Sequence, residues 1–313
     1  MVDTLTIDEQ LSTKTASLAS HIGNTPLFKV DGLHSNPNVE IYAKLEWQQM
    51  GGSVKARPAY DIIQNAIQTG QLGNGRVLLD ASSGNTAIAY ASIAAALGIQ
   101  VEICLPANAS QERKNILQRL GANLTLTSEF GGTDDAQQVA REMYHVNPEK
   151  YFYADQYNNQ NNWRAHYKGT GHEIWNQTNG TITHFVSALG TTGTFTGTTR
   201  RLKKLNHEIT SISLQPDGPM HGLEGWKHLE TAIVPGIYDS RLANEDWGID
   251  TADAYQLIPQ IASRTGLLVS PSSAANLAGA IKLSDQINEG VIVTMFPDNA
   301  EKYSEVMTQI FNQ

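Results

Sequence analysis

The chain has 313 residues, of which 40% are hydrophobic and 17% charged, and its net charge is −9. This composition indicates a folded globular protein of about two domains, and the acidic balance without a basic block argues against a nucleic-acid partner. No apolar run is long enough to span a membrane, and residues 1–20 lack a signal-peptide core. The single cysteine, Cys104, cannot form an internal disulfide. We therefore expect a cytoplasmic protein that binds no membrane.

Strand and helix patterns alternate along the chain after a polar arm over residues 1–20. Short strands are predicted at 27–30 and 39–45, and a helix is predicted directly after Lys55. The next elements are predicted as strand 76–79, helix 86–97, strand 101–105, helix 111–120, strand 124–127, helix 134–144, strand 151–154, a helix near 163–175, strand 184–187, helix 194–205, strand 209–214, helix 252–264, strand 267–269, helix 274–287, strand 291–295 and a terminal helix. Alternation with short connections predicts α/β layers with mostly parallel sheets, and the strand count suits two sheets.

The stretch around Lys55 is the first candidate for chemistry. Gly51 and Gly52 precede this lysine, and apolar residues then recur at helical spacing, namely Ala59, Ile62, Ile63, Ala66 and Ile67. A cation at a helix start is disfavoured by the helix dipole. Because this favours the neutral, nucleophilic form, Lys55 is a candidate reactive amine, with a solvated surface lysine as the alternative.

Three further glycine- or serine-rich turns fall between a predicted strand and a predicted helix, where ligands bind in α/β folds. The first is Asp80-Ala81-Ser82-Ser83-Gly84-Asn85-Thr86. Its small polar residues at a helix start suit an anion site, or else Ser83 or Asn85 is an ordinary N-cap.

The second turn holds three glycines and five threonines within residues 190–198, after a predicted strand. Backbone donors and hydroxyls without bulk suit a phosphate. The pattern matches neither the Walker motif nor the dinucleotide fingerprint, so it does not argue for a nucleotide. A structural turn is the alternative.

The third turn is Val269-Ser270-Pro271-Ser272-Ser273, in which a serine either caps the helix or donates to a buried acceptor such as a ring nitrogen. A reactive lysine, a phosphate cradle, an anion site and a neutral hydroxyl together suggest pyridoxal phosphate as the cofactor.

From about Ile22 to Tyr303 the chain resembles the cysteine synthase (O-acetylserine sulfhydrylase) family of fold type II pyridoxal-phosphate enzymes. The segments 182–186 and 171–175 are most similar to the B-isozyme branch. The motifs that carry the resemblance are Gly23-Asn24-Thr25-Pro26, Gly52-Ser53-Val54-Lys55, Ser83-Gly84-Asn85-Thr86, Gly190-Thr191-Thr192-Gly193-Thr194 and Ser272-Ser273.

The resemblance implies a tryptophan synthase β-like fold of two α/β domains with the cofactor in the cleft. Residues 48–157 would form a smaller mobile domain, and residues 1–47 and 158–313 a larger one. It also implies a homodimer, with serine acetyltransferase or a sulfur-carrier protein as a further partner.

The resemblance also implies roles for single residues. Lys55 would form the internal Schiff base and later move the α-proton, and Asn85 would bond the cofactor's ring hydroxyl. Ser272 would meet the pyridine nitrogen. The phosphate would be held by Gly190, Thr191, Thr192, Gly193 and Thr194, and the substrate carboxylate by Ser82, Ser83, Gly84, Thr86 and Gln156. The implied reaction is a β-replacement that forms L-cysteine from an activated serine (O-acetylserine) and sulfide or a thiol through an aminoacrylate, with no metal.

Several positions depart from the family pattern, where Met50 replaces a proline, Ala56 an aspartate, and Ala87, Ala274 and Ala300 glycines. The donor and the nucleophile therefore stay open. Lys227, in the irregular stretch 215–248, is either a solvated lysine or a ligand for the phosphate of an O-phosphoserine donor. The alternatives are an O-phosphoserine sulfhydrylase, a cystathionine- or diaminopropionate-forming enzyme, and a low-activity homologue that acts as a binding or regulatory protein.

Overall fold

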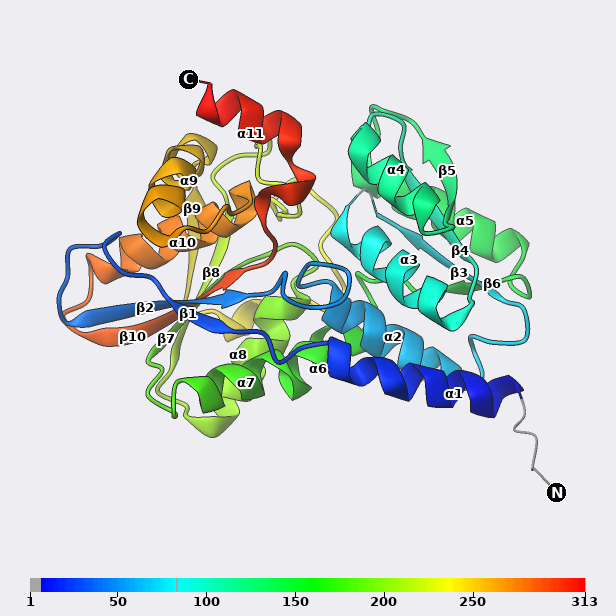
Figure 1. The fold of residues 1–313 in the computed structure, drawn as a ribbon, viewed down its shortest axis with the longest axis horizontal. Helices are drawn as coiled ribbons and strands as arrows, with labels where there is room; N and C mark the ends of the chain where they lie inside the picture. The colour runs from blue at the N-terminus through cyan, green and yellow to red at the C-terminus, as the bar shows by residue number, and fades with distance from the viewer. Residues whose placement is uncertain (1–6, 83, 313) are drawn as a thin grey trace. The chain divides into compact units, whose positions relative to one another are not determined.

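The computed structural model describes residues 7–82 and 84–312, and the chain divides by its internal contacts into two compact units (Figure 1). The first unit runs up to Gly23 and also includes Gln49–Gly51 and Lys55–Asn162. The second includes Asn24–Gln48, Gly52–Val54 and the chain from Trp163 onward. Within the described ranges, no helix is long and apolar enough to cross a lipid bilayer.

The first unit is built on a parallel four-stranded sheet. Its elements are α1 (Ile7–Leu18), η1 (Ala19–His21), α2 (Ala56–Gln68), β3 (Val77–Ala81), α3 (Asn85–Leu97), β4 (Val101–Pro106), α4 (Gln111–Arg119), β5 (Asn123–Thr127), α5 (Gly132–Val146) and β6 (Tyr151–Tyr153). The strand order is β5-β4-β3-β6. Successive strand residues point to opposite faces. Leu78 and Ile103 therefore join the core formed with α2, α3 and α4, whereas Leu79 and Cys104 pack with α5.

The predicted division placed residues 1–47 with the C-terminal part of the chain. By contacts, α1 instead packs on α2 and α3 of the first unit. The mobility of a smaller domain stays a prediction.

The second unit is built on a mixed six-stranded sheet in the order β1-β2-β10-β7-β8-β9, in which only β1 is antiparallel to its neighbour. Its elements are β1 (Leu27–Lys29), β2 (Val39–Leu45), α6 (Gln160–Lys168), which begins in the first unit, α7 (Thr170–Gln177), β7 (His184–Ala188), α8 (Gly193–Leu205), β8 (Thr210–Pro216), η2 (Ser240–Leu242), β9 (Glu245–Ile249), α9 (Thr251–Thr265), α10 (Pro271–Ser284), β10 (Gly290–Phe296), η3 (Ala300–Lys302) and α11 (Ser304–Phe311). Phe185 and Val293 pack with α7 and α8, and Val186 and Ile292 pack with α9 and α10. Figure 1 shows these helix pairs on opposite sides of the sheet.

Local signals placed most helices correctly. The helix after Lys55 begins at Ala56, Ser110 caps α4 by accepting a hydrogen bond from the Arg113 N–H, and Gly98 ends α3 in the left-handed conformation. These predictions are confirmed.

Four element predictions are wrong. The helix near 163–175 is two helices, because the backbone bends at Gly169. Residues 267–269 form no strand, and only Val269 makes a bridge, to Asn299. The last long helix begins at Pro271, because Ser270 caps it. The stretch 215–248 contains most of β9, which the sequence pattern did not indicate.

Strand order determines which loops meet. From β3 the chain moves outward to β4 and β5, and it returns to pair β6 with the other edge of β3. The loops after β3 and β6 therefore leave adjacent strand ends at the point where the order reverses, which is where ligands bind in open α/β sheets. In the second unit the same reversal brings together the loops after β7 and β10.

Candidate functional site

In the first unit, hydrogen bonds join the loop after β3 to the segment after β6. Gln156 is buried, and its side-chain amide donates to the Ala81 carbonyl at 2.8 Å. Its side-chain oxygen accepts from the Thr86 hydroxyl at 2.7 Å. The two segments predicted to bind a substrate carboxylate are thus one connected structure.

The start of α3 is organised by Ser82. Its hydroxyl accepts from the backbone N–H groups of Gly84 and Ala87, both at 3.3 Å. Asn85 and Thr86 stand in the first turn, at the positive end of the helix dipole, where an anion is favoured. Ser83, predicted to bind the same carboxylate, lies outside the described residues.

Lys55 stands immediately before α2, as predicted, with its carbonyl accepting from the Ala59 N–H at 3.1 Å. The glycines before it adopt positive φ, 81° at Gly51 and 62° at Gly52, a conformation that favours glycine. The sequence motif is therefore a backbone requirement of the turn that presents the lysine.

In the second unit, the loop between β7 and α8 is compact and largely buried. A Cβ added at Gly190 would lie 2.1 Å from the Gly225 carbonyl oxygen, so this position requires glycine. Thr192 is buried with φ of 69°, and its hydroxyl forms no hydrogen bond to any described residue.

Two further residues adjoin this loop. The buried His166 contacts the Thr194 hydroxyl through Nε2 at 3.3 Å and the Thr170 hydroxyl through Nδ1 at 2.8 Å. Lys227 lies beside the loop, because its backbone N–H donates to the Leu189 carbonyl at 2.8 Å.

Ser272 lies in the first turn of α10 and is buried. Its hydroxyl is 3.2 Å from the Ser270 hydroxyl and 3.4 Å from the Asp298 carboxylate. The other Asp298 oxygen accepts from the Tyr303 hydroxyl at 2.6 Å. The serine thus belongs to a buried polar cluster at the carboxyl end of β10.

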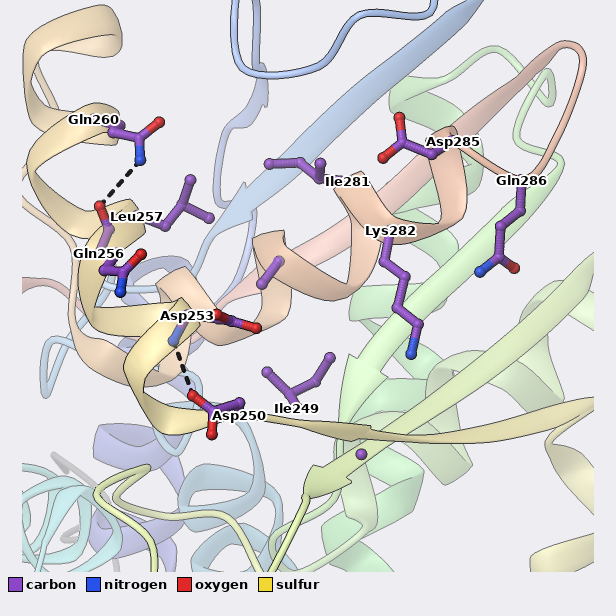
Figure 2. Close-up of a pocket in the computed structure, with 12 residues that line it drawn as sticks. Ile249, Asp250, Asp253, Gln256, Leu257, Gln260, Ile281, Lys282, Asp285 and Gln286 are labelled. Carbon is purple, nitrogen blue, oxygen red and sulfur yellow. Dashed lines mark hydrogen bonds between the residues drawn. The ribbon is translucent and has the colours of Figure 1, made fainter.

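A separate cavity of about 580 Å³ opens between β9, α9 and α10 (Figure 2). Its wall combines apolar side chains such as Ile249 and Leu257 with the charged Asp253 and Lys282. None of the residues predicted to bind cofactor or substrate lines it.

Residues 18–298 match the family model described as pyridoxal-phosphate dependent enzyme. The chain belongs to this family. Over 303 residues it is 46% identical to a cysteine synthase of Aquifex aeolicus, which covers 95% of this chain and 93% of that protein. It is 37% identical to cysteine synthase B of Escherichia coli K12, covering 95% and 97%. A crystal structure of a cysteine synthase from Entamoeba histolytica shares the fold with a TM-score of 0.88 and 31% identity, covering 95% of this chain and 90% of that one.

This pyridoxal-phosphate dependent enzyme has residues that fit the cofactor. A phosphate needs several donors, and the unpartnered Thr192 hydroxyl is one at the start of the long helix α8. Because Gly190 has no side chain, the loop can lie close to the Gly225 carbonyl. The predicted fold class and cofactor are confirmed by the family, whereas the roles of single residues toward the cofactor and substrate stay predictions.

The sequence pattern assigned no role to three fully buried carboxylates, Glu46, Asp80 and Asp298. Burial raises the pKa of the Asp80 carboxyl from 3.8 to about 7. A signal was present for Asp80, because β3 is otherwise apolar and buried charges need partners. Its partner on the segment after β6, Gln156, is too distant in sequence for a local pattern to indicate it.

Proposed function

We propose that this protein is a cysteine synthase that converts O-acetylserine and sulfide into L-cysteine and acetate. The observation that carries the proposal is the 46% identity to a cysteine synthase along 95% of the chain. The start of α3, where the helix dipole favours an anion, and the compact loop of small residues before α8 give it physical support.

Bound pyridoxal phosphate would withdraw electrons from the substrate's α-carbon and so make its proton acidic. Lys55 would hold the cofactor covalently through Nζ. Once the substrate amine has displaced it, Lys55 would take the α-proton as a base. Its position at a helix start, where the helix dipole disfavours a cation, suits both tasks.

The remaining residues bind and orient. The loop Gly190–Thr194 would hold the phosphate, Asn85 would bond the ring hydroxyl, and the start of α3 with Gln156 would hold the substrate's α-carboxylate. Ser272 would present a neutral hydroxyl to the ring nitrogen. Because a hydroxyl keeps a proton there less firmly than a carboxylate, elimination at the β-carbon is favoured over transamination.

The experiment that tests the function supplies the purified holoenzyme with O-acetylserine and sulfide and quantifies L-cysteine and acetate. L-serine in place of O-acetylserine is the control, since it has a poorer leaving group. Cysteine formed from O-acetylserine supports the proposal. A holoenzyme that retains its cofactor and forms no cysteine would instead favour a binding or regulatory protein.

A second candidate donor is O-phosphoserine. The observation that favours it is the bond from the Lys227 backbone N–H to the Leu189 carbonyl, which holds the backbone of this lysine beside the loop before α8. An ammonium group is a good ligand for phosphate. Lys227→Ala would then lower the use of O-phosphoserine and leave that of O-acetylserine unchanged, whereas Lys204→Ala, on the exposed end of α8, would change neither. Equal effects of Lys227→Ala on both donors would rule out this assignment.

We further propose that the enzyme acts in the cytoplasm as a homodimer and that serine acetyltransferase or a sulfur-carrier protein binds it. The resemblance to cysteine synthases supports these assignments. Light scattering should give twice the mass of one chain, and co-purification with the acetyltransferase of the same organism would test that partner.

A further inference from the structure

Asp80 is the penultimate residue of β3 and is fully buried, and each of its carboxylate oxygens accepts a backbone hydrogen bond. Oδ1 accepts from the Ala81 N–H at 2.8 Å. Oδ2 accepts from the Gln156 N–H at 3.2 Å. One carboxylate therefore binds both Ala81, the last residue of β3, and the segment after β6.

Further hydrogen bonds join the same two segments. The Gln156 side chain donates to the Ala81 carbonyl and accepts from Thr86, and the Gln156 carbonyl accepts from the Asn162 side chain at 2.6 Å. Together with the bonds of Asp80 they form closed rings, so the position of Thr86 relative to Gln156 depends on this carboxylate.

We propose that Asp80 is a positioning residue for the substrate's α-carboxylate, because it fixes the loop after β3 against the segment that carries Gln156. This inference rests on the proposed function, since it concerns the same carboxylate site. Asp80 does not itself touch substrate in this assignment.

Stability alone does not account for a carboxylate at this position. Transfer of a charge from water into a protein interior costs free energy, and burial of an apolar side chain of similar volume at this position would cost less. The neighbouring strand residues Leu78, Leu79 and Ala81 are apolar and buried. A carboxylate that holds two separate backbone N–H groups, however, performs a task that an apolar side chain cannot.

Burial raises the pKa of Asp80 to about 7, so its charge changes near neutrality. Above that pH both oxygens accept N–H bonds, whereas below it one oxygen carries a proton and accepts less well. The titratable groups that face Asp80 are Tyr90 of α3, Cys104 of β4, Tyr153 of β6, and Asp155 and Tyr157 after β6, with Arg141 of α5 beside Tyr153 and Asp155. Arg141 is the cation among them, and it acts on Asp155 and Tyr153.

The test compares Asp80→Asn with the wild-type holoenzyme. Asparagine keeps the size and one acceptor oxygen but presents N–H groups in place of the other. The matched control is Glu102→Gln on the adjacent strand β4, whose carboxylate accepts from Thr125 and bonds neither segment of the site. Measurements are KM and kcat for O-acetylserine, the Kd of L-serine from its effect on the visible spectrum, the Kd of pyridoxal phosphate, and the melting temperature.

For Asp80→Asn we expect KM and the L-serine Kd to rise about tenfold, since one N–H loses its acceptor, with kcat and cofactor affinity nearly unchanged. In the wild type the L-serine Kd should rise as the pH falls through about 7, and Asp80→Asn should lack this step. L-serine is used because sulfide ionises in the same range. A variant that keeps the wild-type Kd, or keeps its pH step, overturns the proposal.

Should Asp80→Asn fail to fold, Asp155→Asn gives a second test. Besides burial, the charge of Asp155 raises the pKa of Asp80, so its removal should move the midpoint of the L-serine pH step to lower pH. An unmoved midpoint overturns the proposal. Because L-serine binding needs no turnover, a wild type that makes no cysteine contradicts the proposed function alone, and the binding comparison still decides the role of Asp80.

Discussion

In the second unit, the Lys302 ammonium donates a 2.8 Å hydrogen bond to the Gly52 carbonyl. Two residues further on, the Val54 N–H donates to the Pro297 carbonyl, also at 2.8 Å. The C-terminal segment thus holds the backbone on both sides of Ser53, directly before the candidate reactive lysine. Motion of this stretch would also move Lys55, which follows it in the chain. We therefore expect Lys302 to affect the reaction without touching substrate.

We expect Lys302→Met to lower kcat for cysteine formation about threefold to tenfold, because a hydrogen bond from a charged donor is lost beside the catalytic turn. Lys302→Arg keeps a cationic donor and should retain most of the activity. Lys282→Met removes a lysine that lies over the Trp247 ring, elsewhere in the same unit, and should leave kcat unchanged. Equal kcat values for Lys302→Met and the wild type would show that the contact does not position Lys55.

Lys55→Ala should abolish the visible absorption of covalently held pyridoxal phosphate and bring cysteine formation below detection, since no other group replaces the amine. The loop before α8 is intact in this variant, so the cofactor should still bind reversibly. Lys14→Ala, at an exposed position of α1, should behave like the wild type. Retention of covalently bound cofactor by Lys55→Ala would show that another lysine holds it.

Local sequence patterns were sufficient where a feature depends on neighbouring residues. The helix after Lys55 follows from its apolar face, of which Ile62 and Ile63 are fully buried, and the positive φ of Gly51 agrees with the glycine pair. Residues 190–192 lie between β7 and α8, as predicted, and the helix begins at Gly193, one residue earlier than the pattern indicated.

Features that depend on tertiary partners were not accessible from the sequence. β9 reads Glu-Asp-Trp-Gly-Ile, which lacks strand alternation, and it forms because β8 offers a free edge. The bond between Asp80 and Gln156 joins residues that are 76 apart. Ala87 and Ala274 replace family glycines, and both side chains lie within the hydrophobic cores, so each unit accommodates the added Cβ.

Thr192→Val should weaken pyridoxal-phosphate binding about tenfold. The buried Thr192 hydroxyl has no partner among the described residues, so its removal would eliminate only a hydrogen bond to the phosphate. The apoprotein should melt at the same or a higher temperature, since an unsatisfied polar group is removed. Thr199→Val is the matched control, with another buried, unpartnered hydroxyl on α8. It should leave the cofactor Kd unchanged, and equal Kd changes in the two variants would contradict a phosphate role for Thr192.

Gly190→Ala should destabilise the loop by about 2 kcal/mol and reduce the cofactor content of the purified protein, because the new Cβ would lie 2.1 Å from the Gly225 carbonyl oxygen. Neither atom belongs to a flexible side chain, so the backbone itself must move. A Cβ at Gly218 would meet no atom within 4 Å, and Gly218→Ala should therefore be neutral in thermal unfolding. A fully loaded Gly190→Ala protein with the wild-type melting temperature would show that the loop is more adaptable than its packing suggests.

Asp239 should make stability depend on pH in the acid range. Hydrogen bonds from Arg241, and then from Arg200, lower the pKa of its carboxyl from 3.8 to about 2. Because the unfolded state binds the proton more tightly, the contribution to stability is present above pH 3.8 and is lost as the pH falls through about 2. Arg241 is largely exposed, so Asp239→Asn should lower the free energy of unfolding near neutrality by only about 1 kcal/mol.

Urea unfolding across the acid range should show that this difference shrinks below pH 3.8. The control is Glu149→Gln, at a side chain that is 93% exposed, which should show no such change. A difference that stays constant with pH would mean that Asp239 acts through its backbone contacts instead of its charge.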